Sequence, residues 1–381
     1  MYKILLIVLY SSLLFSNKKV LHLTFHSACA ADISYVCRKF DLEVDTWNIS
    51  CMQNRFLDPG KSNSSNVIMD HDKAERIFEA HKATFEKYDL IITSDIAPLS
   101  RIFLQNNWKK PLLIWVCNRF DINVKQSGFN EFPDREYLDL FENAQFLENV
   151  EIVGCTEYEK FHAQKNRNIT SIKKIIYPTG VENPKGWNSI PINVNKKGVI
   201  FFRDYFNERK INLGLVLKLH GVKAYSGEYG GSVDLKDFLG IVHIPCVMEN
   251  SAMWDNLSNS IVHFLPTKEF YRELYINRKI YFIDWTLPTN CTNDLPIEEI
   301  FKYSSWYRDD LAPLFVFFNS FSDLRDLVKN TDYTNKKKAI KKWHRNHVIS
   351  TLKSWEPVFN RLIGTGVKDF SWVNNEVISS T

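Results

Sequence analysis

Basic side chains follow one short apolar segment in the second half of the chain. Residues 199–202 (VIFF) are typical of a buried strand, and Arg203 comes directly after them. Arg209 and Lys210 then begin a segment with the apolar spacing of a helix. A guanidinium binds two anionic oxygens at once and a lysine adds a point charge, so this arrangement suits a diphosphate. A solvated charged loop is the alternative interpretation of the same residues.

Two carboxylates follow a second apolar segment. Glu249 comes after residues 241–247 (IVHIPCV), and Asp255 stands further on, with five residues between the two acids. A carboxylate accepts hydrogen bonds, so these side chains suit the vicinal hydroxyls of a ribose or a hexose. An exposed position on a helix is the alternative interpretation of Asp255.

The loop after the first predicted strand is rich in small residues. It reads HSACAAD over residues 26–32, and it contains neither GxGxxG nor a Walker A sequence, which excludes the standard dinucleotide and P-loop sites. Small residues still let an oxygen-rich ligand approach the N-terminus of the next helix. His26 suits a hydrogen bond to that ligand or the role of a base. A histidine packed at the end of a strand is an equal alternative.

Short apolar strands and helices alternate along the first half of the chain. This alternation predicts a parallel sheet with helices on both faces, because strands buried on both sides are continuously apolar. The predicted strands lie at 19–25, 42–48, 88–95, 111–117, 150–156 and 173–178, and the predicted helices at 31–40, 71–87 and 157–166.

A break rich in Gly, Pro and Asn at 179–198 separates this half from a second α/β pattern. There, helices are predicted at 210–221 and 234–240, and one long basic helix at 335–363, bent or broken near Pro357. We therefore predict an α/β protein with two Rossmann-like domains facing a cleft and a long C-terminal helix. The predicted divisions are an apolar leader at 1–17, a first Rossmann-like domain at 18–182, a linker at 183–197, a second Rossmann-like domain at 198–345 and a helix at 346–381 that returns toward the first domain.

Composition restricts the class of protein. The 381 residues are 45% hydrophobic, which is ample for two cores, and the formal net charge is +4. That charge permits anionic small ligands but is not the dense basic face of a duplex-binding protein, so no nucleic-acid partner is expected. The seven cysteines include no CxxC, which argues against a disulfide framework or a structural zinc.

The N-terminal residues 1–17 are mostly apolar, with lysines directly after them. This stretch is shorter than the roughly 20 residues of a spanning helix and fits the apolar region of a signal peptide. We interpret it as a signal or short anchor, and expect a membrane-associated or lumenal location rather than a cytoplasmic one. An apolar strand or buried helix is the alternative.

The order of these segments resembles the GT-B glycosyltransferases, especially the retaining, nucleotide-sugar-dependent group. The resemblance extends from KVLHLTFHSACAADI through YDLIITSD, PLLIWVCNRFD, IIYPTGVE and VIFFRDYFNERK to GVKAYSGEYGGSVDLKDFLGIVHIPCVMENSAMWDNLSNSIVHFLP. The sequence also resembles transferases of large algal viruses. The family normally has two glutamates with seven residues between them, whereas Glu249 and Asp255 have five residues between them and the second acid is shorter.

The resemblance implies transfer of a sugar from a nucleotide-sugar donor to a hydroxyl of a glycan, glycoprotein or glycolipid acceptor. It implies no resident cofactor, and no metal, because Arg203 and Lys210 would hold the donor diphosphate. Catalytic roles are implied for His26, Arg203 and Lys210. Donor-binding roles are implied for Arg209, Gly227, Tyr229, Glu249, Asn250, Ser251 and Asp255, and acceptor-binding roles for Ser27, Asp32, Asn118, Arg119 and Asp121.

Two other classes fit the same pattern. One is a sugar isomerase or phosphorylase on the same fold, although the lysine motif of a phosphorylase cofactor is absent from the sequence. The other is a carbohydrate- or nucleotide-sugar-binding protein that keeps the fold without catalysis, which the altered acid pair favours.

Overall fold

The structure is a computed structural model of the 381-residue chain. It describes residues 18–49, 69–118, 120–121, 134–181, 197–227, 229–283, 291–292 and 295–370. The leader at 1–17 and almost all of the predicted linker lie outside these ranges. Within them, no helix has both the length and the apolar composition needed to cross a membrane.

The first half of the chain forms a six-stranded parallel sheet. Its order is β2 (Glu43–Asn48), β1 (Lys19–Thr24), β3 (Leu90–Ile96), β4 (Leu112–Asn118), β5 (Val150–Gly154) and β6 (Lys174–Ile175). The helices are α2 (Ser27–Lys39), α4 (His71–Phe85), α5 (Arg101–Leu104), α6 (Arg135–Asn143) and α7 (Glu157–Arg167), with 3-10 turns at Ala97–Ser100 and Ala144–Phe146.

Both faces of this sheet are covered, which explains why its central strands are continuously apolar. Successive residues of a strand point to opposite faces. In β3, Leu90 and Ile92 accordingly pack on the α2 side and Ile91 packs on the side of α4 and α5. The sheet predicted for residues 19–178 is confirmed.

The second half forms a five-stranded parallel sheet. Its order is β13 (Val316–Phe318), β10 (His263–Pro266), β9 (Ile241–Val242), β7 (Ile200–Phe202) and β8 (Ala224–Ser226). The helices are α8 (Phe206–Lys210), α9 (Leu213–Leu219), α10 (Ser251–Ser258), α11 (Lys268–Ile276), α12 (Ile297–Tyr303) and α13 (Phe321–Asn330). 3-10 turns lie at Ser232–Leu235, Ser305–Tyr307 and Ala312–Leu314, and β11 (Phe282–Ile283) pairs with β12 (Cys291–Thr292).

Two helix predictions in this half were wrong. The single helix predicted at 210–221 is divided into α8 and α9, because Asn212 takes a left-handed conformation (φ 53°) and caps α9 through the N–H of Leu215. The helix predicted at 234–240 is only a 3-10 turn. There, the Asp234 carboxylate accepts the Gly230 N–H and holds the turn, and the chain has already left helical geometry before Gly240.

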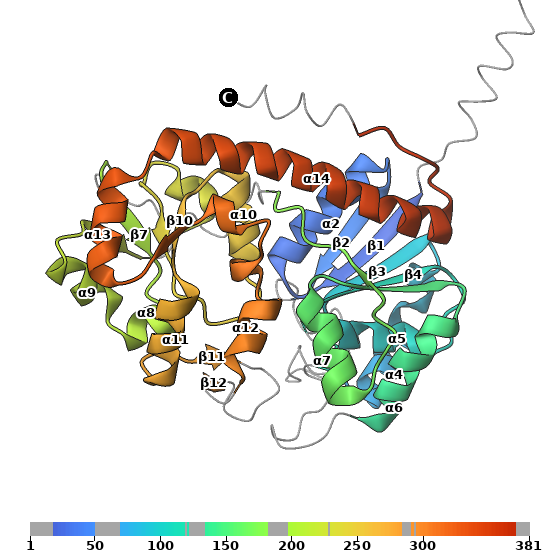
Figure 1. The fold of residues 1–381 in the computed structure, drawn as a ribbon. Helices are drawn as coiled ribbons and strands as arrows, with labels where there is room; N and C mark the ends of the chain where they lie inside the picture. Colours follow the sequence, from blue (N-terminus) through green and yellow to red (C-terminus); the bar gives the residue numbers. More distant parts are fainter. Residues whose placement is uncertain are drawn as a thin grey trace, which may run out of the picture.

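Helix α14 (Tyr333–Ile363) lies across both halves of the molecule (Figure 1). Near its start, Ile340 belongs to the core of the second sheet, whereas Leu352 and Phe359 belong to the core of the first. The helix continues through Pro357 and ends at Gly364, whose φ is +67°. One helix thus contributes to both cores and ties them together. The predicted α/β class, with two Rossmann-like units and a long C-terminal helix, is confirmed.

The segment after β6 packs closely against α10. Gly180 has φ +69°, and a Cβ atom there would lie 2.6 Å from the carbonyl oxygen of Trp254. Only glycine satisfies both conditions. His344 and His347 of α14 contact the carbonyl oxygens of Thr179 and Pro178 through Nε2, at 2.9 and 2.7 Å. The chain therefore leaves the first sheet in a position set by α10 and α14.

Candidate functional site

His26 lies where β1 ends and α2 begins. It is exposed, it caps α2 by accepting the Ala28 N–H on Nδ1 at 3.2 Å, and its own N–H donates to Thr24 Oγ1. Ser27, the first residue of α2, is partly exposed beside it. The predicted histidine therefore stands at the carboxyl edge of the first sheet, at a helix N-terminus.

Asp95, at the end of β3, was missed in the sequence. It is 7% exposed, has φ +69°, and sits at a bulge in the pairing of β3 with β4. A left-handed aspartate costs backbone energy, and such residues cluster at functional sites. Asn118, predicted to bind acceptor, donates from Nδ2 to Asp95 Oδ1 at 2.7 Å. The available signal was that Asp95 ends an apolar strand, just as Arg203 does.

Cys29 lies beside His26 and next to the thiol of Cys117. The hydrogen bond with Cys29 is the largest influence raising the pKa of His26, to about 9, and the charges of Cys29, Asp95 and Asp255 raise it further, while burial lowers it. The Ala28 N–H opposes protonation, because only a neutral ring can accept it on Nδ1. One backbone donor at 3.2 Å is weaker than these influences together, so the pKa of His26 lies above its ordinary value.

Arg203 lies directly after β7 of the second sheet, just as His26 lies shortly after β1 of the first. It is exposed, and its guanidinium carbon lies 4.7 Å from the ring centroid of Tyr205. Nearby is Tyr229: burial is the largest influence raising the pKa of Tyr229, Asp255 adds to it, and Arg203 opposes it. Arg203, Tyr229 and Asp255 therefore share one neighbourhood.

Asp255 connects the two halves of the site. It lies on α10, in the second half of the chain, yet its charge acts both on Tyr229 and on His26 of the first half. The charge of Asp255 therefore reaches residues at the carboxyl edges of both sheets. Gly227 follows β8 on the same edge as Arg203.

Glu249 lies half-buried between β9 and α10. Its carboxylate accepts hydrogen bonds from Trp254 Nε1 and the Ser305 hydroxyl, and burial raises its pKa to about 7. Asn250 caps α10 by accepting the Ala252 N–H at 2.9 Å, and Ser251 begins the helix. Glu249 is therefore held by the protein's own donors, at the start of the helix that carries Asp255.

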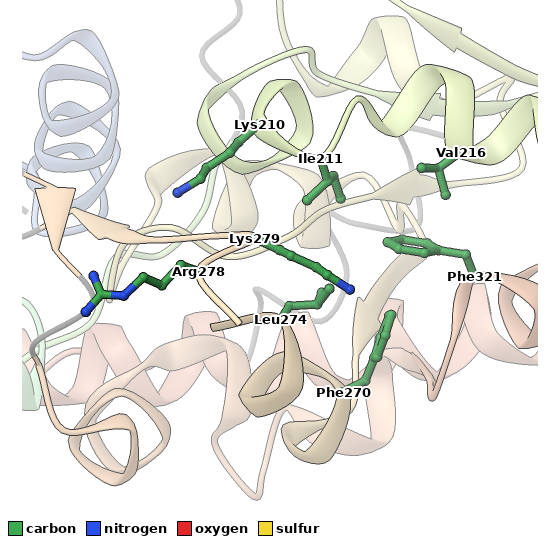
Figure 2. Close-up of a pocket in the computed structure, with 8 residues that line it drawn as sticks. All are labelled: Lys210, Ile211, Val216, Phe270, Leu274, Arg278, Lys279 and Phe321. Carbon is green, nitrogen blue, oxygen red and sulfur yellow. The ribbon is translucent and has the colours of Figure 1, made fainter. Parts of the chain in front are cut away.

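The other two predicted cations have different surroundings. Arg209 is exposed and donates to the carbonyl oxygen of Asp204 at 3.2 Å. Lys210 places its amine 4.3 Å from the ring centroid of Tyr281, and it lines a pocket of about 440 Å³ between α9, α11 and α13 (Figure 2). Lys210 thus contacts a different aromatic ring from Arg203.

Two predicted acceptor-binding carboxylates bind groups of the protein itself. Asp32 is 4% exposed and accepts both the N–H of Thr179, at 2.8 Å, and its hydroxyl. Asp121 accepts from His162 Nε2 at 3.1 Å and from Arg167 Nε at 2.7 Å. Their visible partners are therefore structural. Arg119 lies outside the described residues.

Arg308 is a second residue that sequence patterns did not reveal. Its guanidinium carbon lies 4.0 Å from the ring centroid of Tyr177, and it makes a two-point ion pair with Asp310 at 2.9 and 2.7 Å. Its Nη1 is buried without a hydrogen-bond partner among the described residues. The sequence pattern did not single out Arg308, because this residue lies outside any regular element and its contact with Tyr177 joins positions far apart in the chain.

The sequence matches no protein-family profile and no curated protein. Solved structures are similar to it at low identity. CalG4, the calicheamicin glycosyltransferase, is 8% identical, with 92% of this chain and 100% of that chain covered and a TM-score of 0.42. UGT89C1 of Arabidopsis thaliana complexed with UDP is 12% identical, with coverages of 88% and 100% and a TM-score of 0.41. A UDP-N-acetylglucosamine 2-epimerase is 10% identical, with coverages of 90% and 98% and a TM-score of 0.42.

The chain's own geometry defines its fold class. The protein has two parallel sheets in separate halves of the chain, and the C-terminal helix packs on both cores. This is the two-unit arrangement of the GT-B fold, and the predicted fold is confirmed. Assignment to the retaining group and the likeness to viral transferases stay predictions.

Proposed function

We propose that the chain is a glycosyltransferase that moves a sugar from a nucleotide-sugar donor to a hydroxyl of a glycan, glycoprotein or glycolipid. The observation that supports this most directly is that His26 follows β1 and Arg203 follows β7, at the carboxyl ends of strands in two parallel sheets that α14 ties together. In this proposal, the sheet edge that carries Arg203 and the sheet edge that carries His26 border the same space. Transfer between two hydroxyl-rich substrates needs both edges at the same place.

In the proposed reaction, the acceptor oxygen attacks the anomeric carbon while the bond from that carbon to the diphosphate oxygen breaks. His26 takes the proton of the acceptor hydroxyl, and Asp95 stabilises the imidazolium that forms. Arg203 stabilises the negative charge that develops on the departing diphosphate, which is the role we propose in place of a metal. Asp255 accepts hydrogen bonds from donor hydroxyls.

Other roles belong to the same proposal. The Nη1 of Arg308, which has no hydrogen-bond partner among the described residues, provides a second donor for the diphosphate. Glu249 fixes the positions of Trp254 and Ser305 through the hydrogen bonds that its carboxylate accepts from them. Lys210 retains its proposed role in donor binding only if the bound state brings its amine toward Arg203. A lumenal or membrane-associated location, through residues 1–17, is also proposed.

The proposal is tested by thermal unfolding of the purified chain with UDP-, GDP-, ADP- and CMP-sugars. One nucleotide class should raise the Tm of the native chain and not that of Arg203→Ala. Product analysis with that sugar then separates transfer or donor hydrolysis from epimerisation at the sugar ring. If no nucleotide sugar raises the Tm, the function proposed here is wrong, and a carbohydrate-binding protein on this fold becomes the better assignment.

A further inference from the structure

The pocket beside Lys210 has no role in the proposed reaction. It has a volume of about 440 Å³ and lies between α9, α11 and α13 on the second half of the molecule (Figure 2). That volume is within the range of small-molecule sites. Its lining consists of Lys210, Ile211, Val216, Phe270, Leu274, Arg278, Lys279 and Phe321.

The charged part of this lining is entirely cationic. Lys210, Arg278 and Lys279 contribute three positive side chains, and none of the described lining residues is acidic. The side chain of Lys279 is exposed and has no ion pair among the described residues, and its amine points along the pocket toward the apolar side chains (Figure 2). Three positive side chains around one pocket favour an anionic ligand, because a carboxylate or phosphate accepts charge-assisted hydrogen bonds from them.

The remaining lining is apolar, and the two kinds of side chain are separated. Figure 2 shows Lys210 and Arg278 toward one end and Val216 and Phe321 toward the other, with Lys279 between them. The neighbouring surface is apolar as well: Leu219 of α9 is 75% exposed and Ile276 of α11 is 66% exposed. A ligand that fits this arrangement has a charged head and an apolar body.

We propose that this pocket binds an anionic amphiphile, a single acyl or prenyl chain that carries a carboxylate or a phosphate monoester. The head contacts the amine of Lys279, and the chain lies against Phe270, Leu274 and Phe321. The inference rests on Lys279, which has no role in the proposed sugar transfer, and not on Lys210.

The experiment is isothermal titration of the full chain with dodecanoate and dodecyl phosphate below their micelle concentrations. Both should bind with one site per chain. Dodecanol, which lacks the charge, and inorganic phosphate, which lacks the chain, should bind at least about tenfold more weakly. Shortening the chain should weaken binding about threefold to fourfold for each buried methylene. The relative affinities of the two anions identify the preferred head.

Variants locate the binding in this pocket. Lys279→Met keeps the apolar stem and should weaken dodecyl phosphate binding about tenfold. Lys218→Met, at an exposed lysine of α9 outside the lining, should leave it unchanged. Stabilisation by nucleotide sugars should be equal in Lys279→Met and the native chain, so the two proposals fail separately. Equal binding of dodecanol, an equal effect of both variants, or binding only to anionic vesicles would overturn the assignment.

Discussion

The guanidinium of Arg308 lies over the ring of Tyr177, with 4.0 Å between the guanidinium carbon and the ring centroid. Tyr177 follows the last strand of the first sheet, whereas Arg308 precedes the edge strand of the second. The same guanidinium lies 5.8 Å from the ring of Trp254 on α10. One side chain therefore contacts the two halves of the chain at the place where the candidate site is formed.

Replacement of Arg308 by alanine should lower the free energy of unfolding by about 1–3 kcal/mol, since it removes a partly buried cation–π contact and leaves Asp310 without its two-point partner. Urea denaturation measures this. Arg325→Ala is a matched control, because its ion pair with Asp326 is on the surface of α13 and should leave stability unchanged. An equal loss in both variants would contradict a linking role for Arg308.

Arg203→Ala should lower kcat/KM for nucleotide-sugar turnover by about 10²–10³-fold, because a charged donor aimed at developing negative charge is lost. Its stability should change little, because Arg203 is exposed. Steady-state kinetics and thermal unfolding measure the two effects, and Lys218→Ala serves as a surface control. Turnover that survives in Arg203→Ala would remove this residue from the site.

The rate of transfer should increase with pH toward about 9. His26 acts as a base only when neutral, and its pKa is raised to about 9, chiefly by the hydrogen bond with Cys29. Below that pKa, each decrease of one pH unit lowers the fraction of neutral imidazole about tenfold. Cys29→Ala should move the rise down toward the ordinary value of 6.5, so the variant should be faster than the native enzyme at pH 7.

A pH–rate profile of both enzymes measures this shift. His26→Gln is the control, and it should lose about 10²–10⁴-fold in rate together with the pH dependence. If the profile of the native enzyme is flat between pH 6 and 9, roughly, His26 is not the base.

Stability should decrease as pH rises from about 4 to 6 through the titration of Asp32. Burial raises the pKa of this carboxyl from 3.8 to about 6, so the folded state binds its proton more tightly than the unfolded state. The contribution of Asp32 to the free energy of unfolding is therefore fully present below the unfolded pKa. It is lost as pH rises through the folded pKa, and it amounts to about 3 kcal/mol. Its buried Oδ2, which has no partner among the described residues, is the atom that carries the proton.

Asp32→Asn should flatten this part of the stability profile, because an amide has the same shape and does not ionise, while its oxygen still accepts the N–H of Thr179. Urea denaturation from pH 4 to 7, approximately, measures the profile. Asp72→Asn, at an exposed position of α4, is the matched control. A profile that is unchanged in Asp32→Asn would show that another group titrates.

Local pattern was sufficient for much of the fold. The continuous apolar runs at 90–96 and 112–118 could be identified as buried strands, because a parallel sheet covered on both faces leaves no polar alternation. The long amphipathic helix that became α14 was evident from its spacing, and Arg203 was identified from its position after a strand. These features depend on residues that are neighbours in the sequence.

Only the tertiary structure determined which residues that are distant in the sequence contact one another. Asp95 contacts Asn118, and Arg308 contacts Tyr177, only because strand order and the crossing of α14 bring distant segments together. The same packing placed Lys210 beside Tyr281 and turned Asp32 toward Thr179. A sequence pattern reports which face of an element is apolar. It does not report which distant side chain will satisfy a buried charge, because that partner is selected when the two cores form.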